Sequence, residues 1–313
     1  MENSKMSIYT SPFDQFQRYY TVKKIITGLT QDKKVKVLEV GANAHCKLRE
    51  FIPQADIVFT DINEQPVPSD VTFIKADATD LPFSDDEFDF VVSTDVLEHV
   101  PLALREKFIN ECYRVSKTAF ILACPIDNGM TTQVEVETNE TFKRLLDIDF
   151  IWLKEHIDEG LPRVDFVNEI ANSQAIPFVR FEHGRLDWWQ SLMKMHFIKE
   201  AEPELRSACG AVDEYYNRNL YKEDFGGACY RSFWVLGLDS LNKDILGWTP
   251  TTATNYIEEM DYYQKICSAA ENMAFSIKEL RQNLDNTQKE LDEVKSDTNQ
   301  AKVEAEQAEA KAE

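Results

Sequence analysis

Three histidines in this 313-residue sequence are candidates for taking a proton from a substrate, because imidazole is the side chain used most often for that task. His99 closes the segment Asp95-Val96-Leu97-Glu98-His99, and His156 follows Glu155. His183 follows a predicted strand, so it can overhang a cleft. Neighbouring residues of a helix point about 100° apart, so we expect only one of Glu155 and His156 to enter a site directly, and we favour His156. The alternative role for His99 is helix capping or loop ordering. For Glu155 and His156 the alternative is that both cap their helix or lie on its solvated face.

A second set of polar residues lies where predicted strands end. Glu39 lies near the end of the first strand and Gly41 follows it, and Asp61 ends the second. Asp77 follows the third strand, and Ser93, Thr94 and Asp95 end the fourth. A carboxylate such as Asp61 can accept hydrogen bonds from two neighbouring hydroxyl groups.

The elements that must position these residues alternate between strand and helix. The predicted strands are 35–40, 55–60, 71–75, 88–94 and 118–124, and a helix is predicted over 101–115. This alternation predicts an α/β fold with a doubly wound, Rossmann-like parallel sheet, in which ligands bind at the carboxyl ends of the strands. Helical insertions are predicted over 139–175, with a break at Gly160 and Pro162, and over 188–214. An edge strand at 178–182 and a late strand at 228–236 complete the predicted sheet.

The strand-end residues resemble the motifs of class I S-adenosylmethionine (SAM)-dependent methyltransferases. Glu39-x-Gly41 resembles the acidic residue and glycine of the first motif, although Asn43 and His45 depart from its further glycines. Asparagine tolerates a left-handed backbone, so Asn43 can replace a glycine there. The passage from Leu81-Pro82-Phe83 to the strand at 88–94 also resembles the family.

The resemblance implies SAM as the cofactor and assigns residues to it. Asp61 would bind the ribose hydroxyls, and Asp77 the adenine amine. Upstream, Phe13 to Tyr20 resembles the helix that closes over the cofactor, so Arg18 would pair with the methionine carboxylate and Tyr19 would cover the sulfonium region. An amphipathic packing helix is the alternative for that segment. The full predicted cofactor set is Arg18, Tyr19, Glu39, Gly41, Asp61, Ile62, Asp77, Ala78, Ser93, Thr94 and Asp95.

The region from Asn139 to Pro162 resembles methyltransferases of bacterial surface-polysaccharide (O-antigen-type) synthesis. This resemblance implies methylation of a sugar hydroxyl on a cell-surface glycan, which could cap the chain, and a glycosyltransferase partner. Glu155, Trp188 and Trp189 are then candidates for binding the sugar, although the two tryptophans could equally anchor a helix. The competing hypotheses are a small-molecule methyltransferase with an oligomerisation tail, and a non-catalytic coiled-coil scaffold.

The composition narrows the choice of partners. A formal net charge of −21 disfavours nucleic acid, which is bound through clustered Lys and Arg. The six cysteines form no CxxC pair, so we predict reduced thiols and no metal site. No apolar run reaches the roughly 20 residues of a membrane span. With no signal-peptide core at its start, the chain is predicted to be cytoplasmic, reaching the inner face of the membrane only through partners.

The C-terminal region carries a heptad pattern without Gly or Pro. Apolar or small residues recur at alternating steps of four and three from Ile266 to Ala308. With Ile277 at position a, the e and g positions bring Glu290 near Lys295 and Asp297 near Lys302 of a parallel neighbour. We therefore predict a methyltransferase domain at 1–245, a linker and coiled coil at 246–313, and a parallel homo-oligomer through 266–308. A single helix that folds back on the domain is the alternative.

Overall fold

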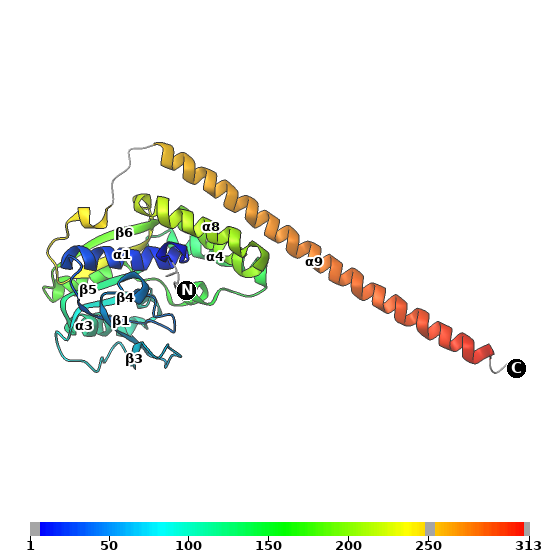
Figure 1. The fold of residues 1–313 in the computed structure, drawn as a ribbon, viewed down its shortest axis with the longest axis horizontal. Helices are drawn as coiled ribbons and strands as arrows, with labels where there is room; N and C mark the ends of the chain where they lie inside the picture. Colours follow the sequence, from blue (N-terminus) through cyan, green and yellow to red (C-terminus); the bar gives the residue numbers. More distant parts are fainter. Residues whose placement is uncertain (1–6, 248–253, 310–313) are drawn as a thin grey trace, which may run out of the picture.

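The computed structural model describes residues 7–247 and 254–309, and it confirms the predicted α/β fold class (Figure 1). Seven strands form one sheet in the order β3-β2-β1-β4-β5-β7-β6. All neighbours are parallel except that β7 is antiparallel to both β5 and β6. The strands are β1 (Lys36–Val40), β2 (Asp56–Asp61), β3 (Thr72–Lys75), β4 (Phe88–Thr94), β5 (Ser116–Pro125), β6 (Phe178–Arg185) and β7 (Cys229–Leu236).

Each predicted strand forms within two residues of its expected start. The central strands β1, β4, β5 and β7 are largely buried apolar runs, whereas β3 and β6 at the sheet edges are more exposed. The strand predicted at the sheet edge, β6, is the edge strand. The predicted break at Gly160 is also confirmed, since Gly160 has φ +77° and ends a helix before Pro162.

Helices cover both faces of the sheet. On one face, α1 (Phe13–Thr30) and α7 (Leu186–Ala201) share a core with Val37, Phe90 and Val92. On the other face, α3 (Arg105–Arg114) and α6 (Val164–Ser173) pack around Leu38, Val91 and Phe120. The doubly wound architecture follows from this division of apolar residues along each strand.

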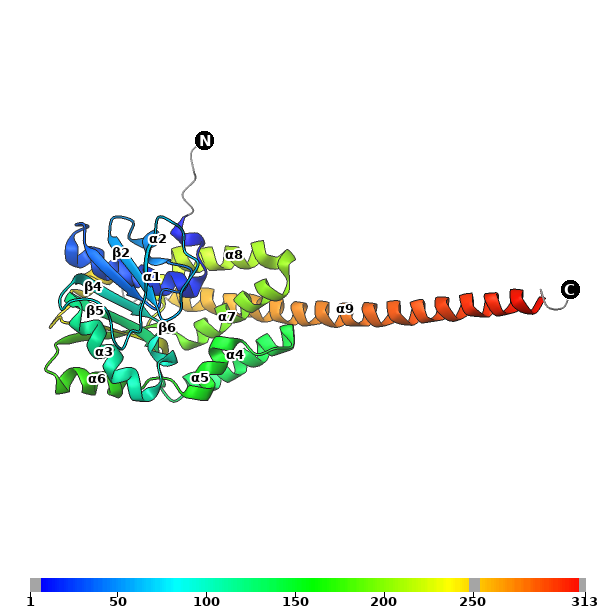
Figure 2. The same ribbon diagram turned by 90° about the horizontal axis from the view of Figure 1, so that it is seen from below.

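The remaining helices lie around this frame (Figure 2). They are α2 (Leu48–Phe51), α4 (Thr131–Leu146), α5 (Ile151–Glu159), α8 (Arg206–Tyr215) and α9 (Thr254–Glu309). The short helices are η1 (Ile8–Thr10), η2 (Leu97–His99), η3 (Leu102–Leu104), η4 (Pro203–Leu205), η5 (Tyr216–Leu220), η6 (Tyr221–Glu223) and η7 (Lys243–Leu246). In the described part of the chain, no helix is both long and apolar enough to span a membrane.

The first part of α9 packs against the domain, and the rest projects far beyond it (Figure 2). Cys267 and Ala274 are buried, and Lys194 of α7 pairs with Glu271 at 3.3 Å. Arg281 pairs with Glu202 at 2.9 Å, and every described side chain after it is exposed. Part of the predicted coiled coil is therefore a helix that lies on the domain. Residues 248–253 of the predicted linker and the last residues, 310–313, lie outside the described residues.

Most heptad positions of α9 point away from the domain, although Ala270 packs against its core. Ile266, Met273 and Leu280 are exposed although their neighbours Cys267 and Ala274 are buried. The same exposed row continues through Leu284 and Leu291 on the projecting part. The apolar seam thus runs along α9 and is fully open to solvent on the projecting part.

Candidate active site

The loop after β1 turns sharply at the carboxyl edge of the sheet. Gly41 has φ +76°, and its N–H donates to the carbonyl of Thr60 at 2.8 Å. Asn43 has φ +52°, as expected for an asparagine that replaces a glycine. Its N–H donates to the Asp61 carboxylate at 3.1 Å. The ends of β1 and β2 are therefore joined directly.

Replacing Gly41 by alanine is expected to destabilise this loop. A Cβ at Gly41 would lie 2.3 Å from Cγ2 of Val96, and the positive φ disfavours any L side chain. We expect Gly41→Ala to lower the free energy of unfolding by about 1–3 kcal/mol, measured by urea denaturation. The double variant Gly41→Ala/Val96→Ala removes the clash but not the backbone strain, so it should recover part of the loss. Unchanged stability of Gly41→Ala would contradict the loop geometry.

The two aspartates predicted to bind the nucleoside part of the cofactor lie at the same edge. One oxygen of Asp61 accepts from Asn43 and the other from the N–H of Asn63 at 3.0 Å, and each oxygen keeps a lone pair for a ligand hydroxyl. Asp77 is exposed, and Thr79 donates twice to its Oδ1, which lowers the pKa of this carboxyl. Asp77 Oδ2 is left to accept from a ligand. Ile62 is 61% exposed beside Asp61, and Ala78 is half-buried.

Helix α1 crosses the ends of β1 and β4. The Tyr19 hydroxyl donates to Glu39 at 2.9 Å, and both side chains are buried. Burial raises the pKa of Glu39 to about 7, against the opposing effects of the Tyr19 hydrogen bond and of Arg18. Arg18 lies 3.1 Å from the Asp95 carboxylate. The predicted cofactor residues Arg18, Tyr19, Glu39 and Asp95 therefore form one connected group.

Asp95 also pairs with Arg231 of β7, a residue that the motif analysis did not single out. The Arg231 guanidinium contacts both Asp95 oxygens, at 2.7 and 2.6 Å, and is 1% exposed. Its third nitrogen donates to Gln17 of α1 at 2.5 Å. Asp95 has φ +54° at the end of β4, and the preceding residues Ser93 and Thr94 are buried. Asp95 thus joins β4, β7 and α1 beneath the loop of Gly41.

Beside Asp95, three side chains converge that could take part in proton transfer. Glu98 and His99 belong to η2, and His156 belongs to α5. One ligand atom from each lies within 4.8 Å of the others. The rings of His99 and His156 are 5.0 Å apart, and Glu98 Oε1 lies 3.9 Å from His156 Nε2. We refer to Glu98, His99 and His156 as the Glu–His–His cluster.

Two polar side chains hold η2 and α5 in this arrangement. The buried Arg105 donates to the carbonyls of Glu98 at 2.9 Å and Gly160 at 3.1 Å, so it ties η2 to the end of α5. Asn139 of α4 accepts from the N–H of Phe150 at 2.8 Å, where α5 begins. The positions of His99 and His156 are therefore fixed from both ends of α5.

The prediction that only His156 points inward agrees with the positions of the two side chains. His156 is 6% exposed, and its Nδ1 lies 2.8 Å from Glu135 of α4. Glu155 is on the outer side, 2.9 Å from Nδ1 of His99, and its side chain is 44% exposed. His156 thus belongs to the cluster, and Glu155 contacts the cluster from outside through His99.

Burial and neighbouring charges together move the pKa values of the two cluster histidines in opposite directions. Burial works to lower the pKa of His156, but the hydrogen bond to Glu135 and the charges of Glu98 and Asp95 raise it above its ordinary value. Burial and the charge of His156 lower the pKa of His99, against the effect of Glu155. Burial and Asp95 raise the pKa of Glu98. Such divergence within a group of touching side chains is typical of sites that move protons.

Three other predicted site residues lie in the core. His183 is fully buried, its Nε2 lies 2.9 Å from the Tyr221 carbonyl, and burial lowers its pKa to about 3. Trp188 and Trp189 are 3% and 2% exposed, and Trp189 stacks on Tyr230. The structure therefore favours the anchoring role for both tryptophans and a packing role for His183, because a substrate cannot reach buried side chains without rearrangement.

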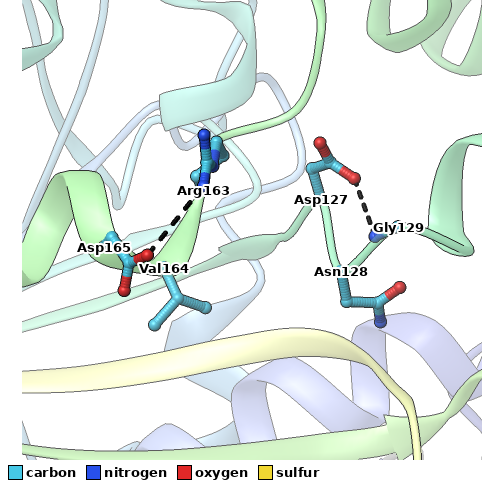
Figure 3. Close-up of a pocket in the computed structure, with 6 residues that line it drawn as sticks. All are labelled: Asp127, Asn128, Gly129, Arg163, Val164 and Asp165. Atoms are coloured by element: carbon cyan, nitrogen blue, oxygen red, sulfur yellow. Dashed lines mark hydrogen bonds and ion pairs between the residues drawn. The ribbon is translucent and has the colours of Figure 1, made fainter.

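An open hollow of about 420 Å³ lies after the carboxyl end of β5. Figure 3 shows Asp127 and Gly129 on one side of it and Arg163 and Asp165 on the other. Asn128 and Val164 complete its lining. None of the predicted cofactor or catalytic residues lines this hollow, so it is separate from the strand-end group.

Residues 38–124 match the family model described as methyltransferase domain. This segment runs from within β1 to within β5, and it includes Glu39, Gly41, Asp61, Asp77 and Asp95. The strand order, with β7 antiparallel, is also typical of class I methyltransferases. The chain carries a methyltransferase domain. SAM is the methyl donor of this enzyme, and the carboxylates at the strand ends fit its hydroxyl and amine groups.

Solved structures of other methyltransferases resemble the chain only distantly. A SAM-dependent methyltransferase from Archaeoglobus fulgidus is 14% identical, with 70% of this chain and 94% of that chain covered and a TM-score of 0.42. A SAM-dependent methyltransferase from Thermotoga maritima is 11% identical, with 71% and 92% covered and a TM-score of 0.41. No curated protein matches the sequence.

Two charged residues of the methyltransferase site were missed because they lie outside the strand-end motifs. Arg231 is a lone charge in a fully buried strand, which is the signal that could have found it. Glu135 lies in the first half of α4, and only the fold brings it against His156. Its position along the helix carries no comparable signal.

Proposed function

We propose that the enzyme O-methylates a hydroxyl group of a saccharide, on a growing or finished cell-surface glycan. The observation that carries this proposal is the position of the Glu–His–His cluster next to Asp95, at the edge where the cofactor residues lie. A hydroxyl acceptor has to lose a proton during methyl transfer, and this cluster can receive it. A glycosyltransferase partner and a location in the cytoplasm, at the inner face of the membrane, are parts of the same proposal.

The surface near the cluster supports a sugar acceptor. Trp152 is 45% exposed, and its ring lies 5.3 Å from that of His99. An exposed aromatic face can pack on the C–H surface of a sugar ring, while the neighbouring Glu155 can accept hydrogen bonds from its hydroxyls. The buried Trp188 and Trp189 no longer serve in this role, and Trp152 takes their place in the proposal.

The reaction is a displacement at carbon. A lone pair of the acceptor oxygen forms a bond to the methyl carbon, and the carbon–sulfur bond breaks with its electron pair remaining on sulfur. The proton of the hydroxyl leaves toward the Glu–His–His cluster. The enzyme contributes by aligning the two reactants and by receiving this proton.

Incubating the purified chain with labelled SAM and a panel of sugar oligomers tests the acceptor. We expect label in the oligomers as an ether-linked methyl group. Label only in a small metabolite or in protein would contradict the glycan acceptor. Binding of SAM without methylation of any acceptor would instead favour a scaffold role.

We further propose that the seam of α9 joins copies of the chain into a parallel homo-oligomer through residues 266–308. The exposed seam residues Leu280, Leu284 and Leu291 support this, since apolar rows at heptad spacing associate in water. The charge pattern supports a parallel arrangement, because it brings Glu290 near Lys295 of the neighbouring copy.

Negative charges in this seam are expected to dissociate the oligomer. The variant Leu284→Glu/Leu291→Glu places four or more carboxylates in a dimer or larger assembly, so light scattering should report the mass of a single chain. The control Asn286→Glu/Ser296→Glu adds the same charge outside the seam and should keep the oligomeric mass. A wild-type chain that is monomeric at the same concentration would contradict this proposal.

A further inference from the structure

The Glu–His–His cluster contains buried polar atoms without partners. The Glu98 side chain is 0% exposed, and neither of its carboxylate oxygens accepts a hydrogen bond within residues 7–247 and 254–309. Nε2 of His156, which is 6% exposed, likewise has no hydrogen-bond partner in the described part of the chain. Buried polar groups in folded proteins normally have a partner, and burying a charged group without one is costly. These atoms point toward one another, so one ligand between them would satisfy them together.

Each histidine of the cluster has a carboxylate against its other ring nitrogen. His156 Nδ1 lies 2.8 Å from Glu135, which also accepts from the Tyr230 hydroxyl at 2.7 Å. His99 Nδ1 lies 2.9 Å from Glu155, in ion-pair contact but without hydrogen-bond geometry, so the hydrogen-bonded arrangement is the one at His156. A carboxylate that receives the Nδ1 proton leaves Nε2 as the electron-pair donor. Metal-binding histidines are oriented by carboxylates in this way.

We propose that Glu98, His99 and His156 bind one divalent metal cation. A set of one carboxylate and two imidazoles suits zinc, manganese, iron or cobalt better than magnesium or calcium, which prefer oxygen ligands. Three protein ligands leave a coordination position open for a fourth. Asp95 is not a ligand, because Arg231 and Arg18 already occupy its oxygens.

The spacing of the donor atoms is compatible with a cation after a small movement. Atoms about 2.1 Å from a tetrahedral zinc ion are roughly 3.4 Å apart. Glu98 Oε1 and His156 Nε2 are 3.9 Å apart, and the whole set lies within 4.8 Å. His99 is the most exposed of the three, at 24%, so its side chain can move inward on binding.

The role of the cation in catalysis rests on the proposed function, but its binding does not. With the cation bound, its three ligands would no longer accept the proton themselves, and the cluster would assist its removal through the cation. The open position would take the acceptor hydroxyl, whose O–H proton would leave to water at the exposed side near Glu155. The oxygen lone pair then attacks the methyl carbon, and the carbon–sulfur electron pair stays on sulfur. The cation acts as a Lewis acid that stabilises the negative charge developing on the acceptor oxygen.

Titration of the purified full-length chain with metal alone tests the binding. After chelator treatment and dialysis, the chain is titrated with Co²⁺ and followed by visible absorption, and with Zn²⁺ by calorimetry, without SAM or acceptor. We expect saturation at one ion per chain and a Co²⁺ spectrum with nitrogen ligands. Glu98→Gln and His156→Gln should each weaken binding by about 10- to 100-fold or more.

Two further variants make the result specific. Glu135→Gln leaves all three ligands in place and should weaken binding by about 10- to 100-fold through the orientation of His156. His196→Gln removes a histidine outside the cluster and should bind as the wild type does. Circular dichroism reports whether each variant is folded. If Glu98→Gln does not fold, the metal affinity of Glu135→Gln tests the site instead.

Absence of stoichiometric binding to the wild type, or binding that none of the cluster variants weakens, would overturn the proposal. Stoichiometric binding together with an acceptor that is not a sugar would leave the metal site in place and remove only the proposed function. If chelator-treated protein that binds no metal methylates sugar oligomers at full rate, the metal site is wrong and the proposed function stands.

Discussion

Replacing His99 by glutamine is expected to lower kcat for methyl transfer by about 10²- to 10⁴-fold, the usual contribution of a group that assists removal of a proton. His99 is the member of the Glu–His–His cluster that reaches the surface, with its side chain 24% exposed beside Trp152. Glutamine keeps a side chain of similar length but cannot accept a proton near neutral pH. The measurement is the single-turnover rate with the acceptor found by the oligomer screen.

The affinity for SAM separates this effect from damage to the cofactor site. In the described part of the chain, the side-chain contacts of His99 are with Glu155, Trp152 and His156, and none of these is predicted to bind SAM, so calorimetry should give His99→Gln the wild-type dissociation constant. His196→Gln is the matched control and should keep both the rate and the affinity. A His99→Gln enzyme with an unchanged rate would show that the cluster does not take part in proton removal.

Replacing Asp95 by asparagine is expected to lower the free energy of unfolding by about 3–5 kcal/mol, since removing one partner of a buried ion pair leaves the other charge uncompensated. Arg231 is 1% exposed, and both of its contacts to Asp95 are shorter than 2.8 Å. Arg18 would lose its contact with Asp95 as well. Urea denaturation followed by circular dichroism measures the change.

An exposed ion pair provides the comparison. Arg185 and Asp187 are 2.9 Å apart, but their side chains are 34% and 50% exposed. Asp187→Asn should therefore change the free energy of unfolding by only about 0–1 kcal/mol. Equal losses in Asp95→Asn and Asp187→Asn would be inconsistent with a buried, unscreened pair at Asp95.

The fold could be predicted because its strands are short apolar runs separated by turns and helices. β4 formed at the predicted residues, and the strand-end carboxylates Asp61 and Asp77 reached one edge because parallel strands all end there. The break at Gly160 was readable for a similarly local reason, since a positive φ suits glycine. The residue types and the periodicity of short segments were sufficient to predict these features from the sequence.

The interior of the site could not be predicted, because its contacts join distant parts of the chain. Asp95 meets Arg231 from 136 positions away, and Glu135 meets His156 from 21 positions away. Burial also decides between site and packing roles that the sequence alone leaves open. His183 and Trp189 are polar or amphipathic by type, but both lie in the core. The heptad pattern did not show that α9 uses another of its faces to pack on α7.

Calorimetric titration of the full-length chain with SAM, beside the variant Asp61→Asn, tests most directly the claim that this enzyme binds SAM at the carboxyl edge of its sheet. The hydrogen bonds of a carboxylate contribute about 1.5–3 kcal/mol each, so replacing Asp61 should raise the dissociation constant by about 10- to 100-fold. We predict one SAM bound per wild-type chain and that loss in Asp61→Asn. No binding to the wild type, or equal binding to both proteins, would contradict the claim.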